Sequence, residues 1–160
     1  MYKVIVSTLA IVAVVGCAET KKFIGEDVKK TNLFACPATK IAIGDVPSCG
    51  KVWKLASGSA ELTPSGDLTA EVKGLVLNDP STGDANGTPD GVDGVAAAVV
   101  CRGVTGTKVS AQTDVVPLSK QGDAEIKAKI PIPADCMSPV IVLRERYQGK
   151  IGGWLAATGM

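Results

Sequence analysis

The sequence predicts an all-β protein, an antiparallel β-sandwich of about eight to nine short strands preceded by an N-terminal signal or anchor segment. Three observations point to this fold. An uncharged apolar run, Val95–Cys101, has the length of a strand buried on both faces. Several other segments alternate between apolar and polar residues, which is the period of a half-buried strand. These segments are short and separated by turn residues, and none reads as a convincing amphipathic helix.

The apolar run Val95–Cys101 is the segment around which we expect the other strands to pack. It carries no charge, and turn residues flank it, with Gly94 before it and Arg102-Gly103 after it. A run of this length is too short for most helices. Because the run ends in Cys101, we also expect a cross-link near the centre of the fold.

A β-hairpin is predicted from Ser59 to Leu77. Its strands are Ser59–Thr63 and Leu68–Leu77, and Pro64–Asp67 forms the turn because proline fixes φ and glycine permits positive φ. The second strand alternates cleanly until Gly74, where the apolar positions shift by one residue. A glycine at such a shift predicts a β-bulge.

The other predicted strands are shorter or less regular, except for Ala124–Ile130. In that strand apolar residues alternate with three charged ones, which we expect on the solvent face. The polar loop 78–94 and the proline-rich crossing Pro131–Cys136 are expected to lie outside the regular ladders. The remaining predicted strands are Lys51–Ser57, Thr107–Gln112, Val115–Leu118, Val140–Leu143 and Ile151–Thr158.

The composition argues against several classes of function. The chain has 160 residues, with 17 Lys and Arg against 16 Asp and Glu, so it does not indicate a basic face for nucleic acid. It has no histidine, which removes histidine-based catalysis and the commonest transition-metal ligand. We therefore expect a single domain that is not an enzyme and that holds no cofactor or metal.

The N-terminus has the form of an export signal. Lys3 precedes an uncharged apolar run, Val4–Val15, which is too short for a stable transmembrane helix. The residues Val14–Cys17 resemble the lipobox of bacterial lipoproteins. The resemblance implies cleavage before Cys17 and lipid attached to its thiol, which makes membrane lipid a partner. An ordinary signal cleaved after Ala18 and an uncleaved anchor helix are the alternatives.

These features divide the chain into three parts. Residues 1–17 are the predicted signal peptide and lipobox, residues 18–33 a polar tether, and residues 34–160 the β-sandwich domain. We expect an exported protein anchored at the cell envelope, on the outer membrane or on the outer face of the plasma membrane. If the lipobox is not used, we expect a freely secreted protein.

The cysteines predict two disulfides. The chain has five cysteines, and assigning Cys17 to lipid leaves an even number for an oxidising compartment. Of the three possible pairings we favour Cys36 with Cys49 and Cys101 with Cys136. Cys101 ends the central strand, and Cys136 precedes a strand that could neighbour it. A four-thiolate zinc site is the alternative, but the chain has no C-x-x-C spacing.

The segment Gly58–Leu75 has the pattern Gly-x-Ala-x-Leu at its start and is loosely similar to the opening hairpin of secreted superoxide-dismutase-like β-sandwiches. The copper and zinc ligands of that family are histidines, and this chain has none. The resemblance therefore implies a shared fold without the metal chemistry.

Four further features are candidate sites. The loop 78–94 places Asp84, Asn86 and Asp90 at alternate positions, as calcium loops do, although Pro89 stands where such loops have glycine, so we favour a solvated loop. Exposed strand edges could accept a partner strand. Trp53 and Trp154 could stack on sugars, but we favour core positions. A glycosidase-like carboxylate pair is the last alternative, and surface charge is favoured for its candidates, Glu61, Glu71, Glu125 and Glu145.

The function expected from the sequence is a lipid-anchored structural or binding module at the cell envelope, with a protein or glycan partner at the cell surface. The alternative is a secreted carbohydrate- or calcium-binding domain that uses the Asp-rich loop 78–94.

Overall fold

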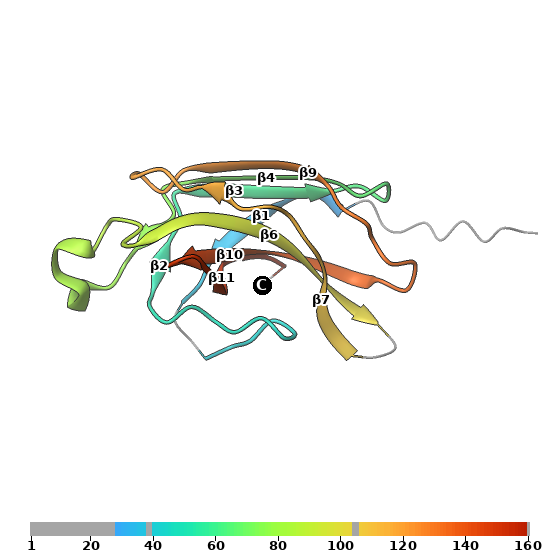
Figure 1. The fold of residues 1–160 in the computed structure, drawn as a ribbon, viewed down its shortest axis with the longest axis horizontal. Coiled ribbons are helices and arrows are strands. Elements are labelled where there is room, and N and C mark those ends of the chain that lie inside the picture. Colours follow the sequence, from blue (N-terminus) through green and yellow to red (C-terminus); the bar gives the residue numbers. More distant parts are fainter. Residues whose placement is uncertain (1–27, 38–39, 104–105, 160) are drawn as a thin grey trace, which may run out of the picture.

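The computed structural model describes residues 28–37, 40–103 and 106–159. Within these ranges no helix is both long and apolar enough to cross a membrane. The chain forms β1 (Val28–Ala35), β2 (Trp53–Lys54), β3 (Ser57–Leu62), β4 (Asp67–Lys73), β5 (Val76–Leu77), the 3₁₀ helix η1 (Pro80–Ala85), β6 (Val92–Gly103), β7 (Gly106–Gln112), β8 (Val116–Pro117), β9 (Ala124–Lys129), β10 (Met137–Tyr147) and β11 (Lys150–Thr158) (Figure 1).

The fold is all-β and antiparallel, as the sequence predicts. One sheet runs in the order β7-β6-β10-β11-β1-β3-β4-β9, with β8 also pairing with β6, while β2 and β5 form a separate pair. The sheet curls into a half-barrel, so that β3, β4 and β9 form a layer above β10 and β11 (Figure 1). The core fills the space between the two layers.

Strand β1 joins the two layers. Its first part pairs with β3, where Thr31 lies opposite Ala60, and its last part pairs with β11, where Leu33 lies opposite Thr158. The prediction of a tether over residues 18–33 is therefore wrong for residues 28–33, and residues 18–27 lie outside the described ranges. The sequence did not predict this strand because its first half is polar and has no alternating apolar face. Backbone hydrogen bonds to the neighbouring strands hold that half in place. Leu33 is buried.

The central strand β6 is buried on both faces, as predicted. Every residue from Val95 to Val100 is at most 1% exposed. Since side chains alternate along a strand, one set faces the core between the layers and the other faces away from it. A segment from outside the sheet must therefore cover the second set.

That covering segment is the strap (residues 40–49), which the disulfide Cys36–Cys49 closes. The indole Nε1 of Trp154 donates a 3.0 Å hydrogen bond to the carbonyl oxygen of Ile41. Further along, Gly44 lies so close to Val100 that a Cβ built on it would come within 2.8 Å of Val100 Cγ1. The strap thus packs over both β11 and β6 and makes a third layer.

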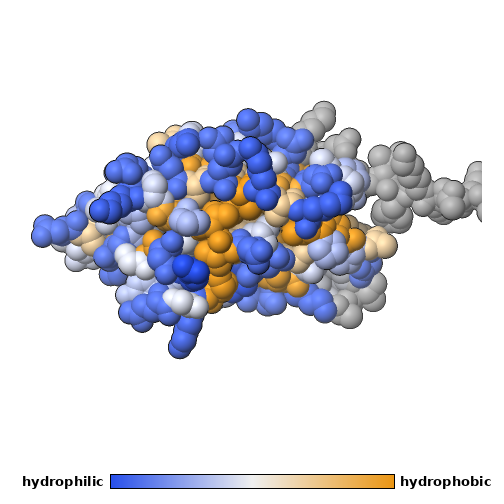
Figure 2. All heavy atoms as spheres, turned by 45° about the horizontal axis from the view of Figure 1, so that its top comes forward, coloured by the Kyte–Doolittle hydropathy of each residue, from blue (hydrophilic) through white to orange (hydrophobic). Residues whose placement is uncertain are grey.

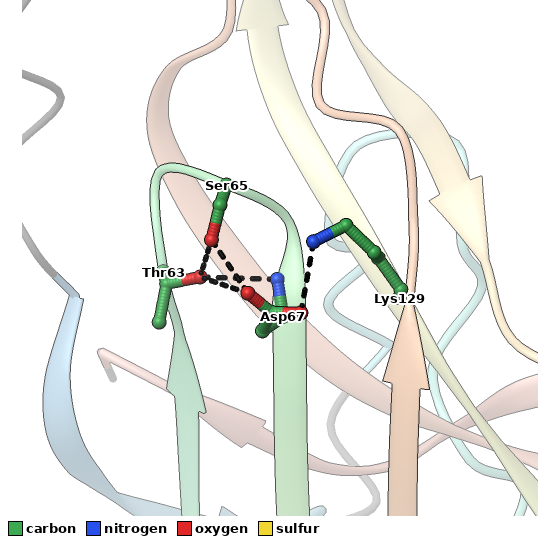
Figure 3. A network of polar contacts seen from close by, with 4 residues as sticks. All are labelled: Thr63, Ser65, Asp67 and Lys129. Carbon is green, nitrogen blue, oxygen red and sulfur yellow. Dashed lines mark hydrogen bonds and ion pairs between the residues drawn. The ribbon is translucent and has the colours of Figure 1, made fainter.

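The β3–β4 hairpin forms around a polar network at its turn (Figure 3). The Asp67 carboxylate accepts a 2.5 Å hydrogen bond from the Ser65 hydroxyl and a 3.1 Å one from Lys129 Nζ on β9. The backbone N–H of Asp67 donates to Thr63 Oγ1 at 3.0 Å. Gly66 has φ of 86°, as the predicted turn requires.

Gly74 ends a strand and does not form the predicted bulge. Strand β4 stops at Lys73, Gly74 takes φ of 64°, and the following residues pair with β2 instead of β3. The backbone N–H of Gly74 is satisfied by the carboxylate of Asp123 at 2.9 Å. The shift of apolar positions thus marks a change of partner strand, which a single sequence does not distinguish from a bulge.

Candidate functional site

All four cysteines of the described domain form disulfides. Cys36 bonds to Cys49 and Cys101 bonds to Cys136, which are the pairs favoured from the sequence. Cys36, Cys49 and Cys101 are buried. The first bond closes the strap, and the second ties the end of β6 to the start of β10. Cys17, the predicted lipidation site, lies outside the described residues.

In the Asp-rich loop 78–94 the predicted ligands Asp84, Asn86 and Asp90 are exposed, and the carboxylates at its two ends have partners of their own. The carboxylate of Asp79 caps η1 by accepting hydrogen bonds from the backbone and the hydroxyl of Ser81. Hydrogen bonds from Ser81 lower the pKa of Asp79. Asp93 pairs with Arg146, through two hydrogen bonds. Within the described ranges, no three acidic or cysteine side chains are grouped as a metal site. Asp79 thus stabilises the loop itself, and Asp93 ties the end of the loop to β10.

Glu71 and Glu125 lie directly opposite each other on β4 and β9, facing solvent. Each has a lysine partner on its own strand, Lys73 for Glu71 and Lys127 for Glu125. The hydrogen bond from Lys127 lowers the pKa of Glu125. A glycosidase acid needs the opposite environment, one that raises the pKa. These two carboxylates are placed as surface charge.

The other two glutamates do not complete a pair. Glu61 is exposed on β3, opposite Thr69. Glu145 on β10 is half-buried, and burial raises the pKa of its carboxyl, while a 3.3 Å hydrogen bond from the N–H of Gly153 acts in the opposite direction.

Both tryptophans belong to the core, as favoured from the sequence. Trp53 is 6% exposed and Trp154 is fully buried. Neither ring offers a face on which a sugar could stack.

The curled sheet is open at the seam, which we define as the break in the hydrogen-bonded ladder between β9 and β7–β8. These strands are the two ends of the curled sheet. Cα atoms of β8 lie within 8 Å of β9, yet the two strands form no ladder. Pro117 in β8 has no N–H to donate, and Pro131 and Pro133 follow β9, so prolines stand on both sides of the break.

Apolar side chains around the seam are only partly covered. Those of the strands and crossing that border it pack against the core while remaining half-buried: Val109, Ala111, Val116, Ala128 and Ile132. Figure 2 shows a face on which hydrophobic surface lies in the middle, with hydrophilic surface above and below it. Partly exposed apolar side chains beside an unpaired strand are typical of an interaction site.

A pocket of about 380 Å³ lies between β7, the end of β6 and the crossing that follows β9. It is lined by two charged residues, Lys108 and Asp135, beside Val109 and Pro133. Neither charged group forms an ion pair within the described part of the chain. Cys101, which is disulfide-bonded to Cys136, also lines the pocket.

Sequence reasoning did not find the seam or the pocket. It named exposed strand edges in general, but which strands end the sheet depends on pairings between distant segments. The only local signal was the set of prolines at positions 117, 131 and 133. Comparison with known proteins adds no identity, because no family model, curated protein or solved structure matches the chain.

Proposed function

We propose that this chain is an exported, lipid-anchored binding module of the cell envelope, held to the membrane through Cys17, without catalytic activity. One observation carries the proposal. The disulfides Cys36–Cys49 and Cys101–Cys136 use every cysteine of the domain and leave only Cys17, at the end of the apolar N-terminal run. Disulfides of this kind persist in oxidising compartments, which supports export.

The binding role is supported by the seam and the adjoining pocket. An envelope domain without a partner has no need to leave half-exposed apolar residues beside an unpaired strand, since such edges invite association. A protein or glycan at the cell surface is the proposed partner class. The absence of histidine and the exposed setting of Glu71 and Glu125 make hydrolysis the less supported activity.

The anchor is tested by intact mass spectrometry of the full chain expressed in a bacterial host, from membrane and soluble fractions. We expect a membrane-bound species that begins at Cys17, carries acyl mass, and shows four thiols only after reduction. The matched control is Cys17→Ser, which keeps the domain and removes the thiol that would carry the lipid. A soluble species lacking Cys17 would instead make the protein a freely secreted module.

A further inference from the structure

The outer edge of β9 has free backbone groups. The N–H of Ile130 donates to the carbonyl of Gly66 at 2.9 Å, and this pair continues the register in which Asp67 lies opposite Lys129. Hydrogen-bonded pairs alternate with non-hydrogen-bonded ones in an antiparallel ladder. The even-numbered residues of β9 therefore bond to β4, and the N–H and C=O groups of Lys127 and Lys129 point away from β4, towards the seam.

The pairing on the other side of β4 agrees with this assignment. The N–H of Thr63 donates to the carbonyl of Asp67, so the odd-numbered residues of β4 bond to β3 and the even-numbered ones to β9. Within the described residues no hydrogen bond uses the outward groups of Lys127 and Lys129. By contrast, the opposite end of the sheet is capped, because the N–H of Val109 in β7 donates to the Asp45 carboxylate of the strap at 2.8 Å.

The side chains beside this free edge indicate which side chains a partner strand would carry. Lys127 and Lys129 are mostly exposed on the outer face, with side-chain exposures of 71% and 68%. Each has an exposed acidic partner on the protein surface, and such ion pairs contribute little, so these lysines remain available to another carboxylate. On the inner face, Ala128 and the nearby Ile132 are half-buried. A strand laid along this edge would place acidic side chains outward and apolar side chains inward.

We propose that the seam receives an extended peptide segment of a partner protein, which pairs with β9 as an added strand. The segment alternates acidic residues, beside Lys127 and Lys129, with apolar residues that cover Ala128 and Ile132. Lys108 of β7, which lines the pocket, offers a further cation on the far side of the seam. Main-chain hydrogen bonds supply the pairing, and the alternate side chains supply the specificity. The proposal rests on the binding role proposed above, and not on the lipid anchor.

The probe is a capped peptide of alternating glutamate and valine, added to the oxidised, isotope-labelled full chain in detergent. Hydrogen exchange at single amides is followed by NMR. We expect the peptide to slow exchange at Lys127 and Lys129 while leaving η1 unchanged. When the added strand is antiparallel, the glutamates opposite Lys127 and Lys129 present their N–H groups to β9. The same peptide with N-methylated glutamates, which lacks these donors, and a lysine–valine peptide should both bind at least about tenfold more weakly.

Lys127→Pro is the decisive variant. It removes one N–H that faces the seam and leaves every hydrogen bond between β4 and β9 in place. An edge strand tolerates proline at a position of this kind. Lys127→Gln is the matched control, because it removes the charge and keeps the N–H. We expect Lys127→Pro to lose peptide binding about tenfold or more, and Lys127→Gln to keep protection of the Lys129 amide with a smaller loss of affinity.

Three results would overturn the proposal. The first is equal binding of the N-methylated peptide, which does not depend on whether the proline variant folds. The second is equal binding by a folded Lys127→Pro protein. The third is protection of the Lys127 and Lys129 amides without peptide that increases with protein concentration, since a second copy of the chain would then be the occupant. The mass experiment on Cys17 is independent of all three.

Discussion

At the scale of single residues, several acidic side chains of this protein organise turns and caps. The Asp67 carboxylate accepts hydrogen bonds from the Ser65 hydroxyl and the Lys129 ammonium, and the Asp67 N–H donates one to the Thr63 hydroxyl (Figure 3). The hydrogen bond from Ser65, followed by that from Lys129, lowers the pKa of Asp67 below its ordinary value of 3.8. A carboxyl whose folded pKa is lowered stabilises the fold when ionised, so its contribution is present above that ordinary value and lost as pH falls through the folded pKa.

Asp67→Asn should therefore destabilise the protein at neutral pH, and the difference from the native protein should shrink as the pH falls below 3.8. The measurement is urea unfolding of both proteins across this range. Asp84→Asn is the control, because Asp84 is exposed on η1 and its side chain makes no hydrogen bond or ion pair within the described part of the chain. If the loss of stability in Asp67→Asn does not depend on pH, the geometry of the side chain, and not its charge, stabilises the turn.

At the scale of elements, the strap explains why β6 needs no polar face. Sandwich strands in contact with solvent alternate, as β9 does, whereas β6 is apolar on both faces from Val95 to Cys101. The strap packs on the second face of β6 at Val100. The cover is irregular backbone, so it has few ladder hydrogen bonds of its own. The disulfide Cys36–Cys49 and the bond from Trp154 to Ile41 replace them.

The double variant Cys36→Ala with Cys49→Ala should lower the free energy of unfolding by about 2–4 kcal/mol, because the unfolded chain is no longer restricted. It should also loosen the strap over Trp154. In a Trp53→Phe background, where only Trp154 emits, we expect fluorescence of the folded protein to shift towards that of a solvated indole. The paired change Cys101→Ala with Cys136→Ala is the control, with lower stability and unchanged emission. Unchanged emission in the strap variant would contradict the role of the disulfide in holding the cover.

At the scale of the whole molecule, the strands that local sequence patterns determine were predicted correctly. The strands with clean alternation, such as β4 and β9, and the buried β6 lie where expected. The errors fall where distant pairing decides the structure. Val28–Ala35 is a strand despite its polar residues, because β3 and β11 both pair with it. At Gly74 the chain changes its partner strand from β3 to β2. The disulfide Cys101–Cys136 was predicted from the positions of its cysteines at strand ends. The seam, however, depends on which strands end the sheet, and that is a property of topology.

Leu33 should therefore control the cohesion of the whole domain. It is buried at the point where β1 passes from β3 to β11, so one side chain supports both layers. We expect Leu33→Ala to cost about 2–5 kcal/mol, the range for truncating a buried leucine. Hydrogen exchange should show β4 and β10 losing protection together. Phe34→Ala is the matched control, since Phe34 is 47% exposed, and should cost less than about 1 kcal/mol. If only one layer loses protection in Leu33→Ala, the layers unfold separately and β1 does not join them energetically.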